Sequence, residues 1–466
     1  MHGQVQYTLE NILDLAKMQS PLAKQAETRK ENRYWQYRLF KSNYNPQLAL
    51  SGNLPGYSRQ FVPVTQPDGS VEFRPVEQTN ARLNLGLLQP IAATGGMLSV
   101  NTNSSRFNDQ LTDLTSYRST VADVTLIQPI FSFNQLRWDK RTEPLRFEES
   151  KRSFVEEMEF VSRTGVERFF DYLDAQVNFQ IAQFNLANND TIYNIEKGRY
   201  NIGTTSEDKL LQVELQLLRS RQDLASAQLA LQTSRLAMRI FIGLTESELF
   251  DLLLPENIPV FIVDETLALQ QAKLNRADFI AFARRKIEAD RQVAQARGER
   301  FQMDLSASFG LNSAAPTLPQ SYMDPNSQQL VNVSLLIPLV NWGRNQARMK
   351  TALANKQLTD YTIAQEEQNF EQEIITLTRQ LEMLRLQIEI SKKSDEVAQK
   401  RYEVAQNRYL IGKIDITNLN IALTEKDNAR RSYINALRSY WVAYYDLRRL
   451  TLYDFERGEL LYVVNE

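Results

Sequence analysis

The chain has 466 residues, of which 42% are hydrophobic and 24% are charged, a composition typical of folded protein rather than of disordered or collagen-like chains. Its formal net charge of −2 gives no sign of the basic surface that nucleic-acid binding requires. Cysteine is absent, which excludes disulfides, thiolate metal sites, cysteine nucleophiles and a lipid-bearing cysteine.

Features of an enzyme are also missing from the sequence. The single histidine, His2, is interpreted as a tag or processing remnant. No phosphate-binding glycine loop or nucleophile elbow occurs, and paired acids such as Glu148-Glu149 fall in helical patterns, where a solvated face explains them. We predict no enzymatic activity, no cofactor, no metal site and no nucleic-acid partner.

Apolar runs are short throughout the chain. The two longest, around Phe250–Val263 and Val331–Trp342, are interrupted by polar residues and do not reach the roughly 18 to 20 residues of a membrane-spanning helix. The first four residues, Met1–Gln4, lack a signal-peptide pattern. If the protein is exported, we expect the printed chain to begin at its mature N-terminus.

Long helical patterns are the main feature in chain order. Helices are expected at Thr8–Ser42, Asn134–Tyr200, Ser206–Ile242, Glu265–Arg300, Gly343–Tyr409 and Thr417–Leu450. At a rise of about 1.5 Å per residue, the second and fifth would each extend on the order of 100 Å. Helices of that length indicate a coiled-coil or helical-barrel assembly.

Between the helices, apolar and polar residues alternate. This alternation predicts strands at Gln47–Leu54, Arg82–Leu87, Leu98–Asn103, Asp123–Leu126, Met303–Phe309 and Val331–Leu335. Each strand would present one apolar and one polar face. The apolar face could lie in the core of a soluble sandwich or against lipid in a transmembrane barrel, and the alternation alone leaves both open.

A repeat with a constant displacement relates the two halves of the chain. Residues 199–203 (Arg-Tyr-Asn-Ile-Gly) match residues 408–412 (Arg-Tyr-Leu-Ile-Gly), 209 positions later, and Pro129 matches Pro338 at the same displacement. Each glycine suits a left-handed helix end, and Ser206 and Asp415 suit the start of the returning helix. The register predicts a duplicated unit of strand, long helix and helix–helix turn.

This arrangement resembles the TolC-like outer-membrane efflux protein family over nearly the whole chain. The resemblance rests on the two turns at 199–203 and 408–412 and on the strand-to-helix junctions at 126–131 and 335–344. It implies a mainly α fold with a transmembrane β-barrel. In such a fold, the internally duplicated long helices form an α-barrel and three identical chains form a homotrimeric channel.

The function implied by the resemblance is that of an exit duct for an efflux or type I secretion system. The channel would lie in the outer membrane of a Gram-negative bacterium, surrounded by lipid, and extend into the periplasm. It would passively conduct substrates from an inner-membrane transporter through a periplasmic adapter (membrane fusion) protein. A structural or adhesive coiled-coil surface protein is the alternative, although the repeat and the alternating strands favour the channel.

The resemblance also suggests site residues at the two turns, which in the family form the gated, adapter-binding periplasmic tip. By position these are Arg199, Tyr200, Ile202, Gly203, Arg408, Tyr409, Ile411 and Gly412. Acidic residues often follow the second turn in this family. Here Asp415 is near, but Asn418 and Ile421 fill the next positions, so Asp415, Asn418 and Asp208 are only candidate gate residues. A helix cap is the other reading of Asp415.

The expected segments follow from these elements. They are an N-terminal periplasmic helix (1–44), barrel strands and loops (45–132), a helical hairpin (133–245), an equatorial linker (246–264), a helix of the second repeat (265–300), a barrel hairpin (301–342), a second helical hairpin (343–452) and a C-terminal equatorial segment (453–466). The first half has room for one extra β-hairpin. We therefore predict six strands per chain instead of the family's usual four, and eighteen in a trimer. Alternatively, residues 57–119 form an elaborated extracellular loop.

Overall fold

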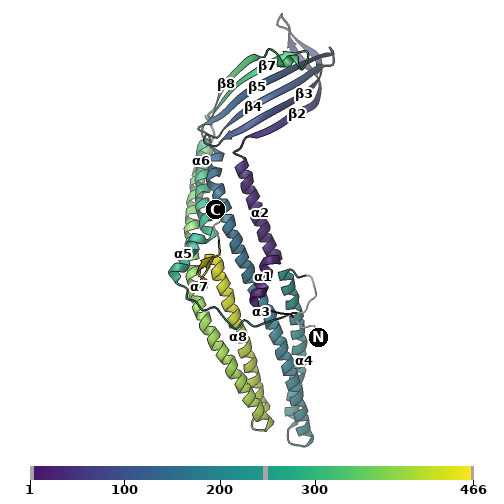
Figure 1. Ribbon diagram of the computed structural model, residues 1–466, viewed down its shortest axis with the longest axis vertical. Helices are drawn as coiled ribbons and strands as arrows, with labels where there is room; N and C mark the ends of the chain where they lie inside the picture. Colours follow the sequence, from purple (N-terminus) through teal and green to yellow (C-terminus); the bar gives the residue numbers. More distant parts are fainter. Residues whose placement is uncertain (1–4, 245–249, 463–466) are drawn as a thin grey trace. The chain divides into compact units, whose positions relative to one another are not determined.

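Residues 5–244 and 250–462 are described by a computed structural model (Figure 1). Their contacts form two units, considered separately below. The sheet unit comprises residues 33–147 and 280–364, and the helical unit comprises the other described residues. His2, like the rest of Met1–Gln4, lies outside the described residues, as do residues 246–249 of the expected linker and 463–466 of the C-terminal segment.

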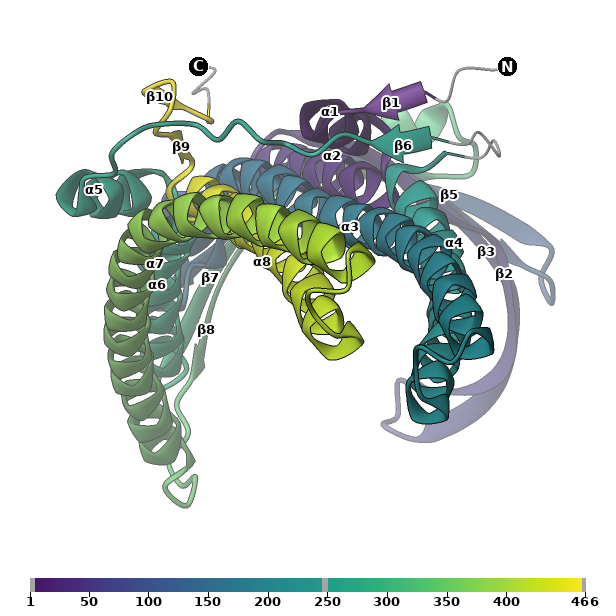
Figure 2. The ribbon, with the colours of Figure 1, turned by 90° about the horizontal axis from the view of Figure 1, so that it is seen from below.

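Four helices match the sequence prediction to within one residue at each end. They are α3 (Gln135–Asn201), α4 (Glu207–Ile242), α7 (Arg344–Leu410) and α8 (Ile416–Thr451). The longest two, α3 and α7, have 67 residues each. A short turn joins α3 to α4 and another joins α7 to α8, so that each pair forms a hairpin (Figure 2).

The expected helix Thr8–Ser42 is instead two helices, α1 (Leu9–Gln19) and α2 (Pro21–Ser42). Pro21 has no amide hydrogen and its ring clashes with the preceding turn, which ends the first helix. Ser20 takes an extended conformation, and its hydroxyl accepts a hydrogen bond of 3.0 Å from the amide of Ala23. The prediction of one continuous helix was wrong.

The expected helix Glu265–Arg300 is likewise divided, into α5 (Glu265–Asn275) and α6 (Ala277–Gly298). Arg276 between them is extended and pairs with Asp278 at 2.7 Å. The freed amide of Ala277 donates to the Glu156 carboxylate at 2.9 Å. Because Glu156 comes from the distant helix α3, this break has no local sequence signal.

The sheet unit contains one sheet of six strands. In spatial order they are β2 (Gln47–Thr65), β3 (Val71–Ile91), β4 (Gly96–Asp109), β5 (Leu114–Ile130), β7 (Gln302–Ala315) and β8 (Asn326–Leu336), and all neighbours are antiparallel. The predicted number of strands is confirmed, and the alternative of a loop at 57–119 is wrong. In the described residues the sheet is open, with β2 and β8 at its edges, so one chain does not form a closed barrel.

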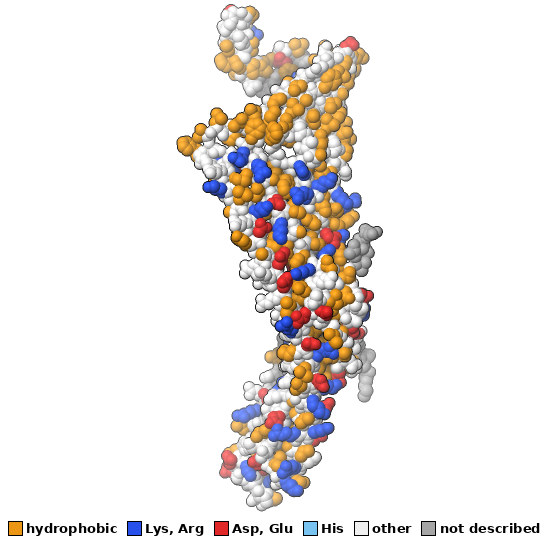
Figure 3. All heavy atoms as spheres, turned by 90° about the vertical axis from the view of Figure 1, so that its left-hand side faces the viewer, with side chains coloured by type: hydrophobic (Ala, Val, Ile, Leu, Met, Phe, Trp, Pro, Cys, Tyr) orange, Lys and Arg blue, Asp and Glu red, His pale blue; other side chains and the backbone are white. Residues whose placement is uncertain are grey.

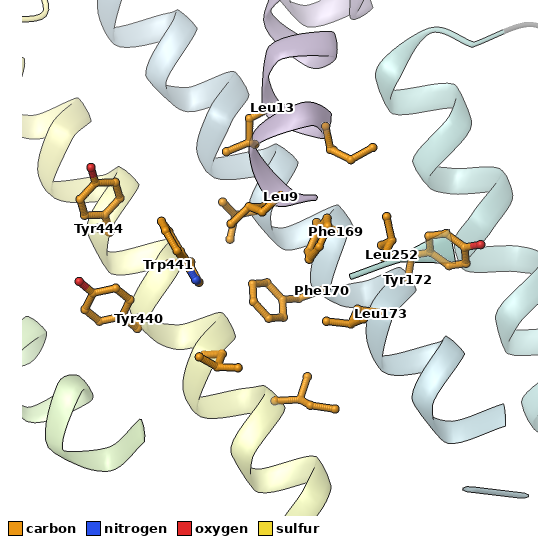
Figure 4. Packing of buried hydrophobic residues seen from close by; sticks show 14 of the residues in the cluster. Leu9, Leu13, Phe169, Phe170, Tyr172, Leu173, Leu252, Tyr440, Trp441 and Tyr444 are labelled. Atoms are coloured by element: carbon orange, nitrogen blue, oxygen red, sulfur yellow. The ribbon is translucent and has the colours of Figure 1, made fainter. Parts of the chain in front are cut away.

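The largest buried cluster belongs to the helical unit. Figure 4 shows Leu9 and Leu13 of α1, Phe170 of α3, and Tyr440 and Trp441 of α8 converging on one another.

The short elements complete the fold. Two short parallel strands pair, β1 (Val5–Tyr7) and β6 (Phe250–Leu252), as Figure 2 shows. The remaining short elements are η1 (Gln320–Tyr322), β9 (Tyr453–Asp454) and β10 (Glu459–Leu460). Within the described residues, no helix has an apolar stretch long enough to cross a membrane.

Candidate functional site

One face of the sheet is apolar across its strands. Residues paired across antiparallel strands share a face, so a row can be followed through the pairing register. One such row consists of Leu48, Leu87, Val100, Val124 and Phe309, taken from β2 to β7. These five side chains are between 40% and 68% exposed. On the face drawn in Figure 3, hydrophobic side chains gather over the strands.

The other face of the sheet carries mostly small or polar side chains. The row next to the apolar one consists of Ala49, Gly86, Asn101, Asp123, Gly310 and Gln328. Side chains of neighbouring residues on a strand point to opposite faces, so this row lies on the opposite side of the sheet. A soluble sandwich would bury the apolar face, whereas here that face is uncovered in the chain.

Aromatic residues mark both junctions between a strand and a long helix. Phe131 follows β5 with φ +61°, and Trp342 follows β8 with φ +52°. Bulky residues rarely adopt the left-handed region, and strain of this kind often accompanies function. Both rings are exposed, Trp342 to 95%. Exposed aromatic rings at one end of an apolar sheet face suit a boundary between lipid and water.

The two helix–helix turns have the same backbone geometry. Gly203 has φ +74° and Gly412 has φ +71°. In the first turn, Thr204 N–H donates to the Arg199 carbonyl at 2.9 Å, and in the second, Lys413 N–H donates to the Arg408 carbonyl at 2.8 Å. Bonds of this span close the Schellman motif of a glycine-ended helix. The duplicated turn is therefore duplicated in structure as well as in sequence.

We expect Gly203→Ala and Gly412→Ala each to destabilise the local turn by about 1 kcal/mol, because the left-handed conformation disfavours a Cβ atom. No heavy atom lies within 4 Å of a Cβ built on either glycine, so the cost arises from the backbone alone. Hydrogen exchange of the turn amides measures the effect. Gly198→Ala, in an open helical position, is the control and should stabilise by up to about 1 kcal/mol. If all three variants changed the stability in the same direction, Gly203 and Gly412 would not be left-handed helix ends.

The two turns differ in the burial of their tyrosines. Tyr409 is only 3% exposed, whereas Tyr200, at the same place in the first repeat, is 41% exposed. The Tyr409 hydroxyl donates to Glu196 Oε1 at 2.6 Å, and Arg199 donates to the same oxygen at 2.7 Å. The Arg199 guanidinium also lies 5.5 Å from the centre of the Tyr409 ring. These contacts join the end of α3 to the end of α7.

The charge of Glu196 is maintained by these neighbours. Burial opposes ionisation, but hydrogen bonds from Tyr409 and Arg199 outweigh it and hold the pKa of Glu196 below its usual value. Burial and the bond to Glu196 raise the pKa of Tyr409. The tyrosine is thus a neutral donor and the glutamate an ionised acceptor, a combination stronger than a neutral pair.

The other predicted site residues lie at the solvent-exposed ends of the hairpins. Ile202 and Ile411 are exposed at the two turns, as is the side chain of Arg408. Asp415 is the N-cap of α8 and accepts a hydrogen bond of 2.9 Å from the Asn418 amide. Ser206 occupies the N-cap of α4 without a side-chain capping bond.

Among the predicted gate residues, hydrogen bonds in the described part of the chain join only Asp415 and Asn418. Asp208 is exposed in the first turn of α4, and Asn418 also donates its side-chain amide to Asp415 at 2.8 Å. In the described residues, no group of three or more His, Cys, Asp or Glu side chains is placed to hold a metal ion.

Glu196 is a site residue that the sequence analysis did not predict. Its signal lies in the repeat, because the position 209 residues later is Ala405. A carboxylate in one copy and an alanine in the other distinguishes the two tips. Only the geometry shows that Glu196 meets the tyrosine of the opposite repeat.

The model of the outer membrane efflux protein family matches residues 94–244 and 268–451. No curated protein matches the chain by sequence. Among solved structures, the CmeC outer membrane channel of Campylobacter jejuni has a TM-score of 0.69 at 17% identity, over 95% of this chain and 85% of that one.

Two further solved structures share the fold. The outer membrane protein VceC of Vibrio cholerae has a TM-score of 0.65 at 14% identity, covering 95% of each chain. The MtrE outer membrane channel of Neisseria gonorrhoeae has a TM-score of 0.65 at 16% identity, over 95% of this chain and 88% of that one. The matched family is one of outer-membrane channels and not of enzymes, so the predicted absence of enzymatic activity is confirmed. The two matched stretches make up well over half of the sequence, and the chain therefore belongs to the outer membrane efflux protein family.

Proposed function

We propose that three copies of this chain close their sheets into one outer-membrane barrel and form an exit duct. The observation that carries the proposal is the pair of adjacent rows in the sheet, one apolar and exposed, the other small and polar. Lipid would cover the apolar face, and the polar face would line water, as in transmembrane barrels.

Closure of the barrel would use the two free edges. An unpaired edge strand is costly in lipid because its backbone groups lack partners. Pairing β2 of one chain with β8 of the next removes every edge after three copies, which gives eighteen strands. The apolar positions from Leu48 to Leu54 span seven residues of β2, or about 20 Å at the usual strand rise. A tilted strand needs about 9–11 residues to cross the hydrocarbon core, so these seven positions would cover most of the span and the exposed Tyr57 follows them.

The hairpins of α3/α4 and α7/α8 would extend into the periplasm and carry the gate at their turns. The exposed Ile202 and Ile411 give each turn an apolar contact point for a periplasmic adapter protein. The contact of Tyr409 with Glu196 fixes one hairpin against the other within a chain. Opening that moves the two hairpins of a chain apart would have to break this contact. Asp208, Asp415 and Asn418, close to the turns, are proposed contributors to the constriction.

Transport through the duct would be passive, and an inner-membrane transporter would supply energy and substrates. Family channels generally work with an adapter and a pump of this kind. We propose that the duct serves efflux or type I secretion, and that the eight segments outlined from the sequence, from 1–44 to 453–466, are its parts.

Reconstitution in a planar lipid bilayer tests this function. The purified detergent-extracted protein should run as a heat-sensitive trimer and should give stepwise conductance in the bilayer. A monodisperse monomer that is soluble without detergent and gives no conductance would overturn the proposal.

A further inference from the structure

A cavity of about 380 Å³ lies in the sheet unit where β5 passes into α3. Its lining combines three arginines, Arg137 and Arg141 of α3 and Arg297 of α6, with the aromatic rings of Trp138 and Phe131. The end of α6 approaches this junction closely, since a Cβ atom at position 298 would lie 2.8 Å from the amide nitrogen of residue 133. The cavity thus lies where these two segments of backbone pack against each other.

The three arginines carry unneutralised charge. In the part of the chain that the structure describes, none of them has an acidic partner within salt-bridge distance. Asp139, which lies between Arg137 and Arg141 in α3, is paired with Arg291 at 3.1 Å. Asn134 caps α3 here by accepting the Arg137 amide at 3.0 Å, so the positive end of the helix adds to the charge.

The aromatic residues give the cavity an apolar side. The Arg141 guanidinium lies 4.8 Å from the centre of the Trp138 ring, which orients its donors. The apolar face of β5 leads to the cavity through Leu126 and Ile130, which share that face by strand alternation, and the exposed Phe131 follows at once. Guanidinium groups beside an apolar surface bind a phosphate that is attached to an acyl chain.

We propose that this cavity binds the phosphate of an anionic phospholipid in the periplasmic leaflet of the outer membrane. The proposal rests on the proposed function, which places the strand-to-helix junction at that surface. The second repeat does not reproduce this site in sequence, since the positions of Arg137 and Trp138 there are Gln346 and Ala347. A trimer would hold three such lipids, each between α3 and α6.

Native mass spectrometry of the delipidated trimer in detergent tests the site. The probes are short-chain phosphatidylglycerol, short-chain phosphatidylcholine and inorganic phosphate. We expect about one phosphatidylglycerol per chain, and the triple variant Arg137→Gln/Arg141→Gln/Arg297→Gln should bind it at least about tenfold more weakly, because each charge-assisted hydrogen bond is strong. Arg297→Gln alone should weaken binding of phosphatidylglycerol by a smaller factor. This single variant replaces the triple variant in the test if the triple variant does not assemble.

The matched control removes three exposed charges elsewhere in the same unit. Lys140, Lys286 and Lys350 are exposed and do not line the cavity, so Lys140→Gln/Lys286→Gln/Lys350→Gln should leave affinity within about twofold. Equal loss in both triple variants, or equal affinity for phosphatidylcholine, would overturn the proposal. Inorganic phosphate that binds as tightly as the lipid would make the site one for a free anion and also overturn it.

Failure of the site is distinguishable from failure of the channel. A protein that conducts but does not retain phosphatidylglycerol would refute the lipid site alone. A protein that binds the lipid through these arginines but neither forms trimers nor conducts would refute the proposed function and leave the site intact.

Discussion

Leu85→Arg is expected to prevent most of the protein from assembling in the outer membrane. Leu85 lies on the apolar face of β3, opposite Leu50 of β2, and is exposed in the single chain. An arginine on the lipid face of a barrel costs about 2–4 kcal/mol near the middle of the bilayer, which is a large part of the stability of a typical domain. The measurement is the fraction of heat-sensitive trimer in isolated outer membranes.

The matched control changes the neighbouring residue to the same side chain. Asn84 pairs with Ser51 and Asn103 on the polar face of the sheet, which would line the water-filled interior. Asn84→Arg should therefore assemble normally and should alter single-channel conductance or ion preference instead. If the two variants assemble equally well, the assignment of the sheet faces is wrong.

Tyr409→Phe is expected to loosen the contact between the two hairpins by about 1.5–3 kcal/mol, the usual contribution of a hydrogen bond to a charged group. The variant leaves the buried carboxylate of Glu196 with one fewer donor. We expect faster hydrogen exchange at the end of α7 and a higher open probability in bilayer recordings. Tyr200→Phe makes the same change at the exposed tyrosine of the other repeat. It should alter the hydrogen exchange and the open probability by amounts that correspond to less than about 0.5 kcal/mol. Equal effects of the two variants would contradict the asymmetry of the tips.

The tip contact also has a predicted pH dependence. The pKa of Glu196 is lowered in the folded chain, with burial opposing and hydrogen bonds from Tyr409 and Arg199 favouring the ionised form. A lowered pKa contributes stability that is present above the unfolded value of about 4.3 and is lost as pH falls through the folded value. The difference in hydrogen exchange between wild type and Tyr409→Phe should therefore persist from pH 7 to about 5 and diminish below about 4. A difference that disappears near pH 6 would exclude Glu196 as its source.

The long helices and the strands could be predicted because their signals are local. Glycine at the left-handed positions 203 and 412 predicted the turns. Period-two alternation predicted where the strands lie, but only part of their length: the expected strand Asp123–Leu126 lies near the end of β5 (Leu114–Ile130). Pro21 is also a local signal, because proline ends the preceding helix and so separates α1 from α2.

Other features depend on residues far apart in the chain and could not be predicted from it. The break at Arg276 requires the carboxylate of Glu156, more than a hundred residues away, to accept the Ala277 amide. The burial of Tyr409 and the exposure of Tyr200 follow from which hairpin each one faces, although both occur in the same motif. The arginine-lined cavity needs α6 beside the start of α3, and no spacing in the sequence encodes that proximity.

Cross-linking of the two sheet edges tests the central claim most directly, since the chain has no cysteine of its own. Ser51 of β2 and Asn332 of β8 lie on the polar face at the two edges. The variant Ser51→Cys/Asn332→Cys, treated in membranes with a short bis-maleimide, should give covalent dimers and trimers and nothing larger, and the single-cysteine variants should give no trimer. Products that stop at the monomer, or that extend beyond three chains, would contradict a barrel closed by three copies.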